Sequence, residues 1–329
     1  MDRGFGAAGK RVVNSQAPSV ASSPWTRQRE RSHLWVLRLM SWIALYAGRR
    51  VARAVLHPIA LYFLITGGAA RRESRRYLAR ALRRPARWSE LYRHVHSFAC
   101  TVLDRVYLLQ GRHDLFDVTL CGSSAVDSAL ARGAGALLVG AHMGSFEVLR
   151  AVGDKQGLRV AMLMYEDNAR LISATLAAVA PNATLNTIAL GRADAMLELR
   201  RWLDGGGVAG ILADRTLAGP HAPSHRSRTH LLPFLGQEAR FSDGPFRLAA
   251  LLRRPVVFMT GLYFGANRYQ IRLVELDDFS LTGPTFASTD ERIAAALQRY
   301  VATLEALCLE APYNWFNFFD FWADESRVH

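Results

Sequence analysis

The sequence predicts an α/β protein with a central, largely parallel sheet flanked by helices, and with an amino-terminal membrane-associated helical region. Apolar runs of strand length alternate with helical patterns through the second half of the chain, which is typical of a parallel sheet. The expected strands cover 136–141, 158–165, 208–213, 255–264 and 269–274. The expected helices cover 144–155, 168–179, 192–204 and 243–253, and a last helix opens at the capping box Ser288-Thr289-Asp290-Glu291 and ends before Pro312.

Length and charge narrow the class of protein. The chain has 329 residues and a formal net charge of +13, and its only lysines are Lys10 and Lys155. Arginine binds phosphate and carboxylate groups through its bidentate fork, so nucleic acid, anionic lipid headgroups and an acidic protein are the candidate partners. The 3 cysteines are far apart and form no CxxC pair, which argues against a disulfide framework or a cysteine-rich zinc site and fits a reducing compartment.

The chain divides into four expected parts. Residues 1–32 lack periodicity and read as a disordered tail rather than a secretory signal. Residues 33–70 are expected to form membrane-associated helices, 71–130 a helical region packing on the core, and 131–322 the α/β domain. Between 73 and 112 the pattern is helical and arginine-rich, which indicates either a solvated basic face or a docking face for an acidic protein or lipid.

The amino-terminal apolar stretches, 34–48 and 59–66, are shorter than the roughly 20 residues that span a bilayer, and arginines lie between them. Tryptophan and tyrosine near their edges suit a membrane interface, and the flanking arginines suit an anionic cytoplasmic leaflet. We expect two interfacial or half-inserted helices. A single spanning helix and a soluble helical subdomain are the alternatives.

The segment from Gly140 to Glu147 is the first candidate site. His142 follows a buried strand, and Glu147 lies in the first turn of the next helix, at the sheet edge where open α/β proteins place their chemistry. Glu147 is expected to reach back to His142, fix its tautomer and make it a general base. The alternative is a structural histidine beside a carboxylate favoured by the helix dipole.

Other polar residues follow neighbouring strands. Asp214 and Arg215 end the expected strand 208–213 and should share an edge with His142, where they would hold the hydroxyls and phosphate of an acceptor. A local ion pair is the alternative. Arg170 follows another expected strand and is a weaker candidate for a phosphate contact.

Several other patterns have simpler explanations. The histidines of 219–230 lack metal-ligand spacing with a carboxylate, so no metal site is expected. The GxGxxG at 205–210 precedes a strand and is therefore a turn. No nucleophile elbow is present, which favours direct transfer over a covalent intermediate. The aromatic segment 314–322 either completes the core or lines an apolar groove or bilayer interface.

Taken together, the basic amino-terminal region, the HxxxxE after a strand and the later Asp214-Arg215 resemble the lysophospholipid acyltransferase superfamily. Within it, the chain is most similar to the bacterial lipid A late acyltransferases, the lauroyl and myristoyl transferases. Pro233-Phe234-Leu235-Gly236 followed by Gly244-Pro245 is also similar to that family. The resemblance covers roughly 34–322, and the segment 311–322 resembles a branch often associated with aryl polyene clusters.

The resemblance implies a membrane-bound O-acyltransferase at the cytoplasmic face of a bacterial inner membrane, with His142 and Glu147 as the catalytic dyad. It implies acyl carrier protein or acyl-CoA as donor, a lipid or glycolipid as acceptor, and no metal or bound cofactor. Lipid A transferases tend to have Asp-Gln or Asp-His where this chain has Asp214-Arg215. The identity of the acceptor therefore stays open.

The expected chemistry is direct acyl transfer. His142 would take the proton of an acceptor hydroxyl, and backbone amides near Gly144 would stabilise the oxyanion. Asp214, Arg215, Gly144 and Arg170 are the expected substrate-binding residues. A noncatalytic basic membrane scaffold, a lipid hydrolase and a nucleic-acid-binding protein are the alternatives, although no nucleic-acid-binding motif is present and no such partner is expected.

Overall fold

The computed structural model describes residues 46, 48–165, 186–192, 194–215, 228–281 and 288–322. The strands are β1 (Asp117–Cys121), β2 (Leu137–Gly144), β3 (Val160–Tyr165), β4 (Asn186–Leu190), β5 (Val208–Leu212), β6 (Thr229–Phe234), β7 (Gln237–Ser242), β8 (Pro255–Tyr263) and β9 (Arg268–Asp278). The helices are an amino-terminal one (Gly48–Thr66), α2 (Gly68–Ala81), α3 (Trp88–Leu109), η1 (His113–Leu115), α4 (Ser124–Ala131), α5 (Phe146–Lys155), α7 (Ala195–Asp204), α8 (Gly244–Leu252) and α9 (Thr289–Glu310).

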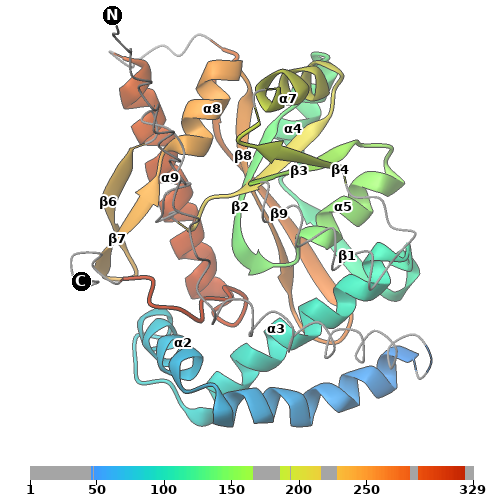
Figure 1. Ribbon diagram of the computed structural model, residues 1–329, viewed down its shortest axis with the longest axis vertical. Coiled ribbons are helices and arrows are strands. Elements are labelled where there is room, and N and C mark those ends of the chain that lie inside the picture. Colours follow the sequence, from blue (N-terminus) through green and yellow to red (C-terminus); the bar gives the residue numbers. More distant parts are fainter. Residues whose placement is uncertain are drawn as a thin grey trace, which may run out of the picture.

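The main sheet has seven strands in the order β1-β9-β8-β2-β5-β3-β4, and β6 and β7 form a separate antiparallel hairpin (Figure 1). Every neighbouring pair in the main sheet is parallel except β8 with β9. The structure therefore confirms an α/β fold with a largely parallel sheet.

Most of the expected core elements are present where the periodicity places them. The five expected strands correspond to β2, β3, β5, β8 and β9, and the Ser288 side chain caps α9 by accepting from the amide of Glu291 at 3.2 Å. The glycines at 205–207 form the turn before β5, as their position in the sequence indicates. The expected helix 168–179 and the tail 1–32 lie outside the described residues.

The expected helical region 71–130 needs correction, because β1 lies within it and pairs with β9 at the edge of the main sheet. Strand β4 and the β6–β7 hairpin were also not expected. β1 and β4 are edge strands of 5 residues each, and neither is buried along its whole length. Short, half-exposed edge strands lack the continuous apolar run that marks a central strand.

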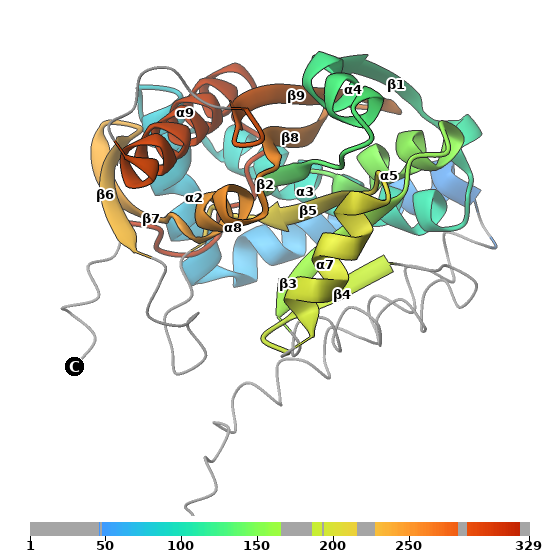
Figure 2. The ribbon, with the colours of Figure 1, turned by 90° about the horizontal axis from the view of Figure 1, so that it is seen from above.

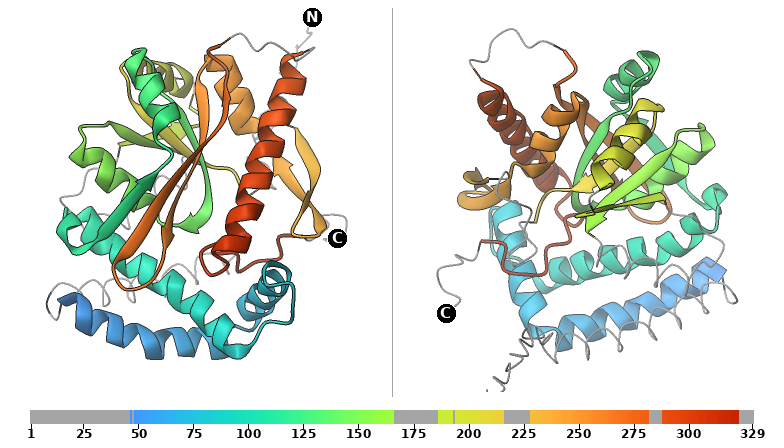
Figure 3. Two further views of the ribbon diagram at one scale, coloured as in Figure 1. Left: turned by 180° about the vertical axis from the view of Figure 1, so that it is seen from behind. Right: turned by 45° about the horizontal axis from the view of Figure 1, so that its top comes forward.

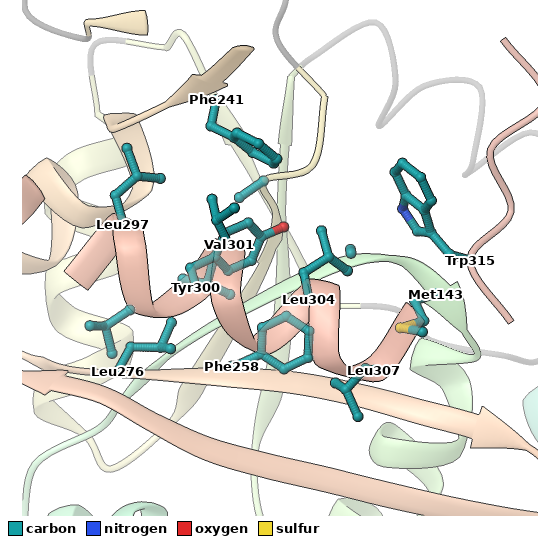
Figure 4. Packing of buried hydrophobic residues seen from close by; sticks show 14 of the residues in the cluster. Met143, Phe241, Phe258, Leu276, Leu297, Tyr300, Val301, Leu304, Leu307 and Trp315 are labelled. Atoms are coloured by element: carbon teal, nitrogen blue, oxygen red, sulfur yellow. The ribbon is translucent and has the colours of Figure 1, made fainter. Parts of the chain in front are cut away.

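Strand β2 is buried on both faces of the sheet. Leu137 and Val139 belong to the apolar cluster that includes α8 and α9, whereas Ala136 and Leu138 belong to the cluster under α3, α4 and α5. Helices therefore cover both faces (Figure 2). Tyr300 and other side chains of α9 form one wall of the first cluster (Figure 4). Packing on both sides fixes the register of β2, because a slip of one residue would exchange its two faces.

The amino-terminal helix Gly48–Thr66 runs antiparallel to α3 beneath the sheet (Figure 3). Arg49 donates to both carboxylate oxygens of Asp104 at 2.9 and 3.0 Å, and the rings of His57 and His96 stack at 4.5 Å. Among the described residues, no single helix is long and apolar enough to cross a membrane. The bent pair Gly48–Thr66 and Gly68–Ala81, with 95° between its helices, meets that criterion only when taken together.

Gly144, at the end of β2, is required by its backbone conformation and by its surroundings. Its φ is +64°, and a Cβ there would lie 2.0 Å from the carbonyl oxygen of Gly261. We expect Gly144→Ala to lower the free energy of unfolding by about 3 kcal/mol or more, because the strained φ and the backbone clash add. Urea unfolding of the two proteins measures this loss.

Gly133 provides the matched control, since its φ is +68° but a Cβ there would meet nothing within 4 Å. We expect Gly133→Ala to lower the free energy of unfolding by only about 1 kcal/mol, which is the conformational cost of a non-glycine residue at positive φ. Equal losses at the two glycines would contradict the close packing assigned to Gly144.

Candidate active site

The carboxyl end of β2 is bulged where it carries His142. Gly140 pairs with Met259 and Gly144 pairs with Gly261, so three residues of β2 stand opposite the single residue Thr260 of β8. The Thr260 hydroxyl donates to the carbonyl of Met143 at 2.8 Å and holds the bulge. Bulges commonly re-aim a side chain beside an active site. Here the bulge sets the direction of His142.

Asp214 contacts His142 directly. Strand β5 neighbours β2, with Gly140 opposite Leu212. The segments that follow these two strands therefore leave the sheet side by side. Asp214 Oδ1 lies 2.8 Å from Nδ1 of His142, and Asp214 Oδ2 accepts from the backbone amide of His142 at 3.0 Å. The structure thus confirms that the two residues share one edge of the sheet.

Trp315 supplies a third hydrogen bond to the Asp214 carboxylate, from its indole nitrogen to Oδ2 at 3.0 Å. Burial by itself raises the pKa of Asp214, but the hydrogen bonds and charge of His142 and the bond from Trp315 together lower the pKa below its ordinary value. Asp214 therefore stays ionised and acts as an acceptor toward Nδ1 of His142, which carries a hydrogen. The Asp214 contact leaves the lone pair on Nε2.

The other side of the imidazole is accessible. The side chain of His142 is 33% exposed, whereas that of Asp214 is 2% exposed. Within the described residues, Nε2 of His142 has no hydrogen-bond partner. A histidine that is held at one nitrogen by a buried carboxylate and open at the other has the arrangement of a general base.

The residues after α9 form a strap, Asn314–Phe316, across the end of β2. The amide of Gly144 donates to the carbonyl of Asn314 at 2.9 Å, and the amide of Phe316 donates to the carbonyl of His142 at 2.8 Å. The Asn314 side chain bonds the backbone of Tyr263 in β8 at 2.7 and 3.1 Å. The strap thus fixes the backbone on both sides of Met143 and brings Trp315 to Asp214.

Glu147 does not hold His142, contrary to the expectation from sequence. One of its carboxylate oxygens lies 2.7 Å from the Arg105 guanidinium on α3, and the other accepts from the Ser145 hydroxyl at 3.1 Å. Glu147 is nearly buried and joins the start of α5 to α3. The orienting carboxylate is Asp214, because the bulge turns the His142 ring toward β5 rather than toward the helix that follows it.

Two further expected roles also change. The amides of Gly144 and Ser145 donate to the carbonyls of Asn314 and Gly261, both at 2.9 Å, so neither is free to stabilise an oxyanion. Asp214 uses its oxygens on His142 and Trp315 rather than on an acceptor.

Of the two arginines expected at the site, the structure describes only Arg215. Arg215 is exposed next to this site, with its guanidinium carbon 4.8 Å from the centre of the Phe319 ring. Its predicted contact with substrate stays a prediction. Arg170 lies outside the described residues.

The sequence does not indicate that Trp315 donates to Asp214 or that Arg105 forms an ion pair with Glu147. The interpretation of the aromatic segment 314–322 as core is correct for 314–317, which are buried, whereas 318–322 are partly or largely exposed. Trp315 is 1% exposed, and its ring lies 5.3 Å from the Phe234 ring and 4.9 Å from the Phe321 ring, centre to centre. Nothing in the local sequence distinguishes the indole that also donates to Asp214.

The chain matches no family model, and no curated protein matches it. The resemblance to the lysophospholipid acyltransferases therefore remains an expectation. In the parts of the chain that the structure describes, no group of three or more histidine, cysteine or acidic side chains is placed to hold a metal ion.

The lowered pKa of Asp214 predicts how its contribution to stability depends on pH. Its charge stabilises the folded state above the unfolded pKa of about 3.9, and this contribution is lost as the pH falls through the lower folded pKa. We expect Asp214→Asn to lower the free energy of unfolding by about 2 kcal/mol at neutral pH. The difference from the wild-type protein should narrow below about pH 4.

Urea unfolding across this pH range measures that difference, and Asp127→Asn in α4 is the control for the loss of one carboxylate. A gap between wild type and Asp214→Asn that stays constant down to about pH 2 would contradict the folded-state bonds assigned to Asp214.

Proposed function

We propose that this protein is an O-acyltransferase that moves a fatty acyl chain from a thioester to a hydroxyl group of a lipid or glycolipid. The observation that carries the proposal is the pairing of His142 Nδ1 with the buried Asp214 carboxylate, at 2.8 Å, beside an accessible Nε2. The resemblance in sequence supplies the class of reaction, and the geometry is compatible with it once Asp214 takes the orienting role.

The proposed reaction needs only one proton carrier. Nε2 of His142 takes the proton of the acceptor hydroxyl while Asp214 stabilises the imidazolium that forms. The acceptor oxygen bonds to the thioester carbonyl carbon, and the tetrahedral intermediate then breaks its carbon–sulfur bond. The proton on Nε2 goes to the leaving thiolate, so the products are an ester and a free thiol.

The first turn of α5 is a candidate source of oxyanion stabilisation. This helix begins at Phe146, two residues after the end of β2, and the leading amides of a helix have no partner within it. The partial positive charge of that terminus favours an anion near the start of α5. With the Gly144 and Ser145 amides occupied, we assign this role to the first turn of α5.

The donor is proposed to be acyl carrier protein or acyl-CoA, both of which are strongly acidic. A cleft of about 640 Å³ on α2 and the loop after it is lined by Arg72, Arg75, Arg76 and Arg84. Glu73, Glu90 and Asp320 form ion pairs with three of these guanidinium groups, so the four arginines exceed the three carboxylates by one positive charge. Such a surface would attract an acidic donor by charge complementarity.

The proposed membrane contact is the outer face of the helix Gly48–Thr66. Its inner face is a narrow buried row, whereas large apolar side chains point outward: Leu61 (49% exposed), Tyr62 (62%), Phe63 (43%) and Ile65 (60%). Trp88 is also exposed, and the guanidinium groups of Arg71 and Arg75 lie over its ring at 5.3 and 5.4 Å. An apolar face beside tryptophan and arginine suits the headgroup region of an anionic leaflet, such as that of a bacterial inner membrane.

His142→Gln should lower acyl transfer by about 10³-fold, because it removes the proposed base while keeping a polar side chain. The assay measures labelled acyl product in lipid extracts together with free thiol released from acyl carrier protein or acyl-CoA. Lipid mass spectrometry of cells with and without the gene identifies the acceptor. Release of free fatty acid without any acylated lipid would instead assign a hydrolase.

His230→Gln is the matched control. His230 also pairs with an aspartate, Asp243, at 3.1 Å, and its side chain is 32% exposed, close to the 33% of His142. Arg247 lies 2.9 Å from Asp243 and neutralises its charge. The His230–Asp243 pair therefore lacks the uncompensated carboxylate charge that Asp214 offers to His142. Equal activity of the two variants, whether high or low, would contradict the role assigned to His142.

Leu61→Asn and Ile65→Asn should each weaken binding to vesicles that contain phosphatidylglycerol by about tenfold, since each removes a large apolar side chain from the proposed contact. Leu231→Asn, at an exposed leucine of β6, is the control and should bind as wild type does. Flotation with the full chain measures the partition. Unchanged partition of all three variants would place the membrane contact elsewhere.

A further inference from the structure

A buried histidine on α3 is hydrogen-bonded at both ring nitrogens. Nε2 of His94 lies 2.8 Å from the carbonyl oxygen of Trp315, and Nδ1 lies 2.8 Å from the hydroxyl oxygen of Ser74 on α2. A carbonyl oxygen only accepts, so Nε2 carries the hydrogen and Nδ1 accepts from the Ser74 hydroxyl. The surroundings therefore hold His94 in one tautomer.

This ring also stays neutral and fixed in place. Burial lowers the pKa of His94 to about 4, although the bond to the Trp315 carbonyl opposes that shift. The ring stacks on Phe318 at 4.7 Å and lies against Tyr77 at 5.5 Å. His94 therefore presents the same N–H donor to the strap at any pH near neutrality.

Trp315 is the junction between this histidine and the candidate active site. Its carbonyl oxygen accepts from His94, and its indole nitrogen donates to Asp214, which in turn holds Nδ1 of His142. Five residues thus form one continuous hydrogen-bonded chain from α2 to the exposed imidazole: Ser74, His94, Trp315, Asp214 and His142. The first four are buried.

We propose that His94 is a positioning residue: by fixing Trp315 it keeps the indole on Asp214, and so keeps the hydrogen of His142 on Nδ1 and the lone pair on Nε2. Without His94, the strap would lose its bond to α3 at the residue that contacts Asp214. The consequence for acyl transfer rests on the proposed function, but the tautomer of His142 can be tested without any substrate.

Tyr77 provides a matched control on the same side of the strap. Its hydroxyl donates from α2 to the carbonyl of Pro312 at 2.8 Å, and its ring packs on Trp315 at 4.9 Å. That bond ends on the backbone of Pro312, which is not a member of the hydrogen-bonded chain that reaches Asp214. Tyr77→Phe therefore removes one buried anchor of the carboxyl-terminal segment while leaving the hydrogen-bonded chain from Ser74 to His142 intact.

The test is ring ¹⁵N NMR of histidine-labelled full-length protein in detergent at neutral pH, with the His142 signals assigned through His142→Gln. His94→Phe keeps an aromatic ring against Phe318 and loses both hydrogen bonds, whereas His94→Gln keeps a donor for the Trp315 carbonyl. We expect wild type, His94→Gln and Tyr77→Phe to show hydrogen on Nδ1 of His142. His94→Phe should show averaged shifts from a mixture of tautomers.

In the acyl-transfer assay, His94→Phe should lower kcat on the order of 10²-fold with little change in KM, because it misplaces the base without touching substrate. His94→Gln should recover most of that loss. A wild-type His142 spectrum in folded His94→Phe overturns the proposal. If the wild-type protein shows no acyl transfer, the proposed function is refuted. The ring ¹⁵N spectra of His142 still decide whether His94 is a positioning residue.

Ser74→Ala covers the case in which His94→Phe does not fold. It keeps the ring and its donor to the Trp315 carbonyl but removes the hydroxyl that donates to Nδ1 of His94 and helps to hold the ring in place. We expect a smaller shift of the His142 signals in the same direction, and a wild-type spectrum from this variant would then overturn the proposal.

Discussion

The hydrogen bond between His142 and Asp214 depends on the parallel pairing of β2 with β5. Because Gly140 stands opposite Leu212, the two strands end side by side, and the residues that follow them meet at 2.8 Å. Burial of β2 on both faces fixes its register, since a shift of one residue would exchange the two faces. The position of the candidate base is therefore a consequence of how the core packs. The bulge at 141–143 then sets the direction in which the His142 side chain points.

Segments far apart in the sequence complete this edge of the sheet. The strap after α9 brings Trp315 to Asp214 across 101 residues, and α3 brings His94 to Trp315 across 221 residues. The helices before the sheet are thus joined to the candidate site by hydrogen bonds. The same helices carry the arginine-lined cleft and the outward apolar face of Gly48–Thr66. The proposed membrane and donor contacts accordingly lie on the layer of helices whose members α2 and α3 are hydrogen-bonded to the candidate site.

Periodicity was sufficient to predict the central strands, the last helix and the common edge that holds His142 and Asp214, because parallel strands bring their carboxyl ends together. It did not indicate which carboxylate holds the imidazole. Glu147 is five residues from His142, but the bulge and the Arg105 ion pair direct the two side chains to different partners. The contributions of Trp315 and His94 depend on tertiary contacts of long sequence separation, for which local patterns carry no signal.

The most direct test of this arrangement is the protonation pattern of the His142 ring in Asp214→Asn and Glu147→Gln, measured by ring ¹⁵N NMR at neutral pH. With Asp214 as the orienting carboxylate, Glu147→Gln should keep the hydrogen on Nδ1 as in the wild-type protein, and Asp214→Asn should lose that preference. A preserved pattern in Asp214→Asn with a lost one in Glu147→Gln would contradict the structure and return the orienting role to Glu147.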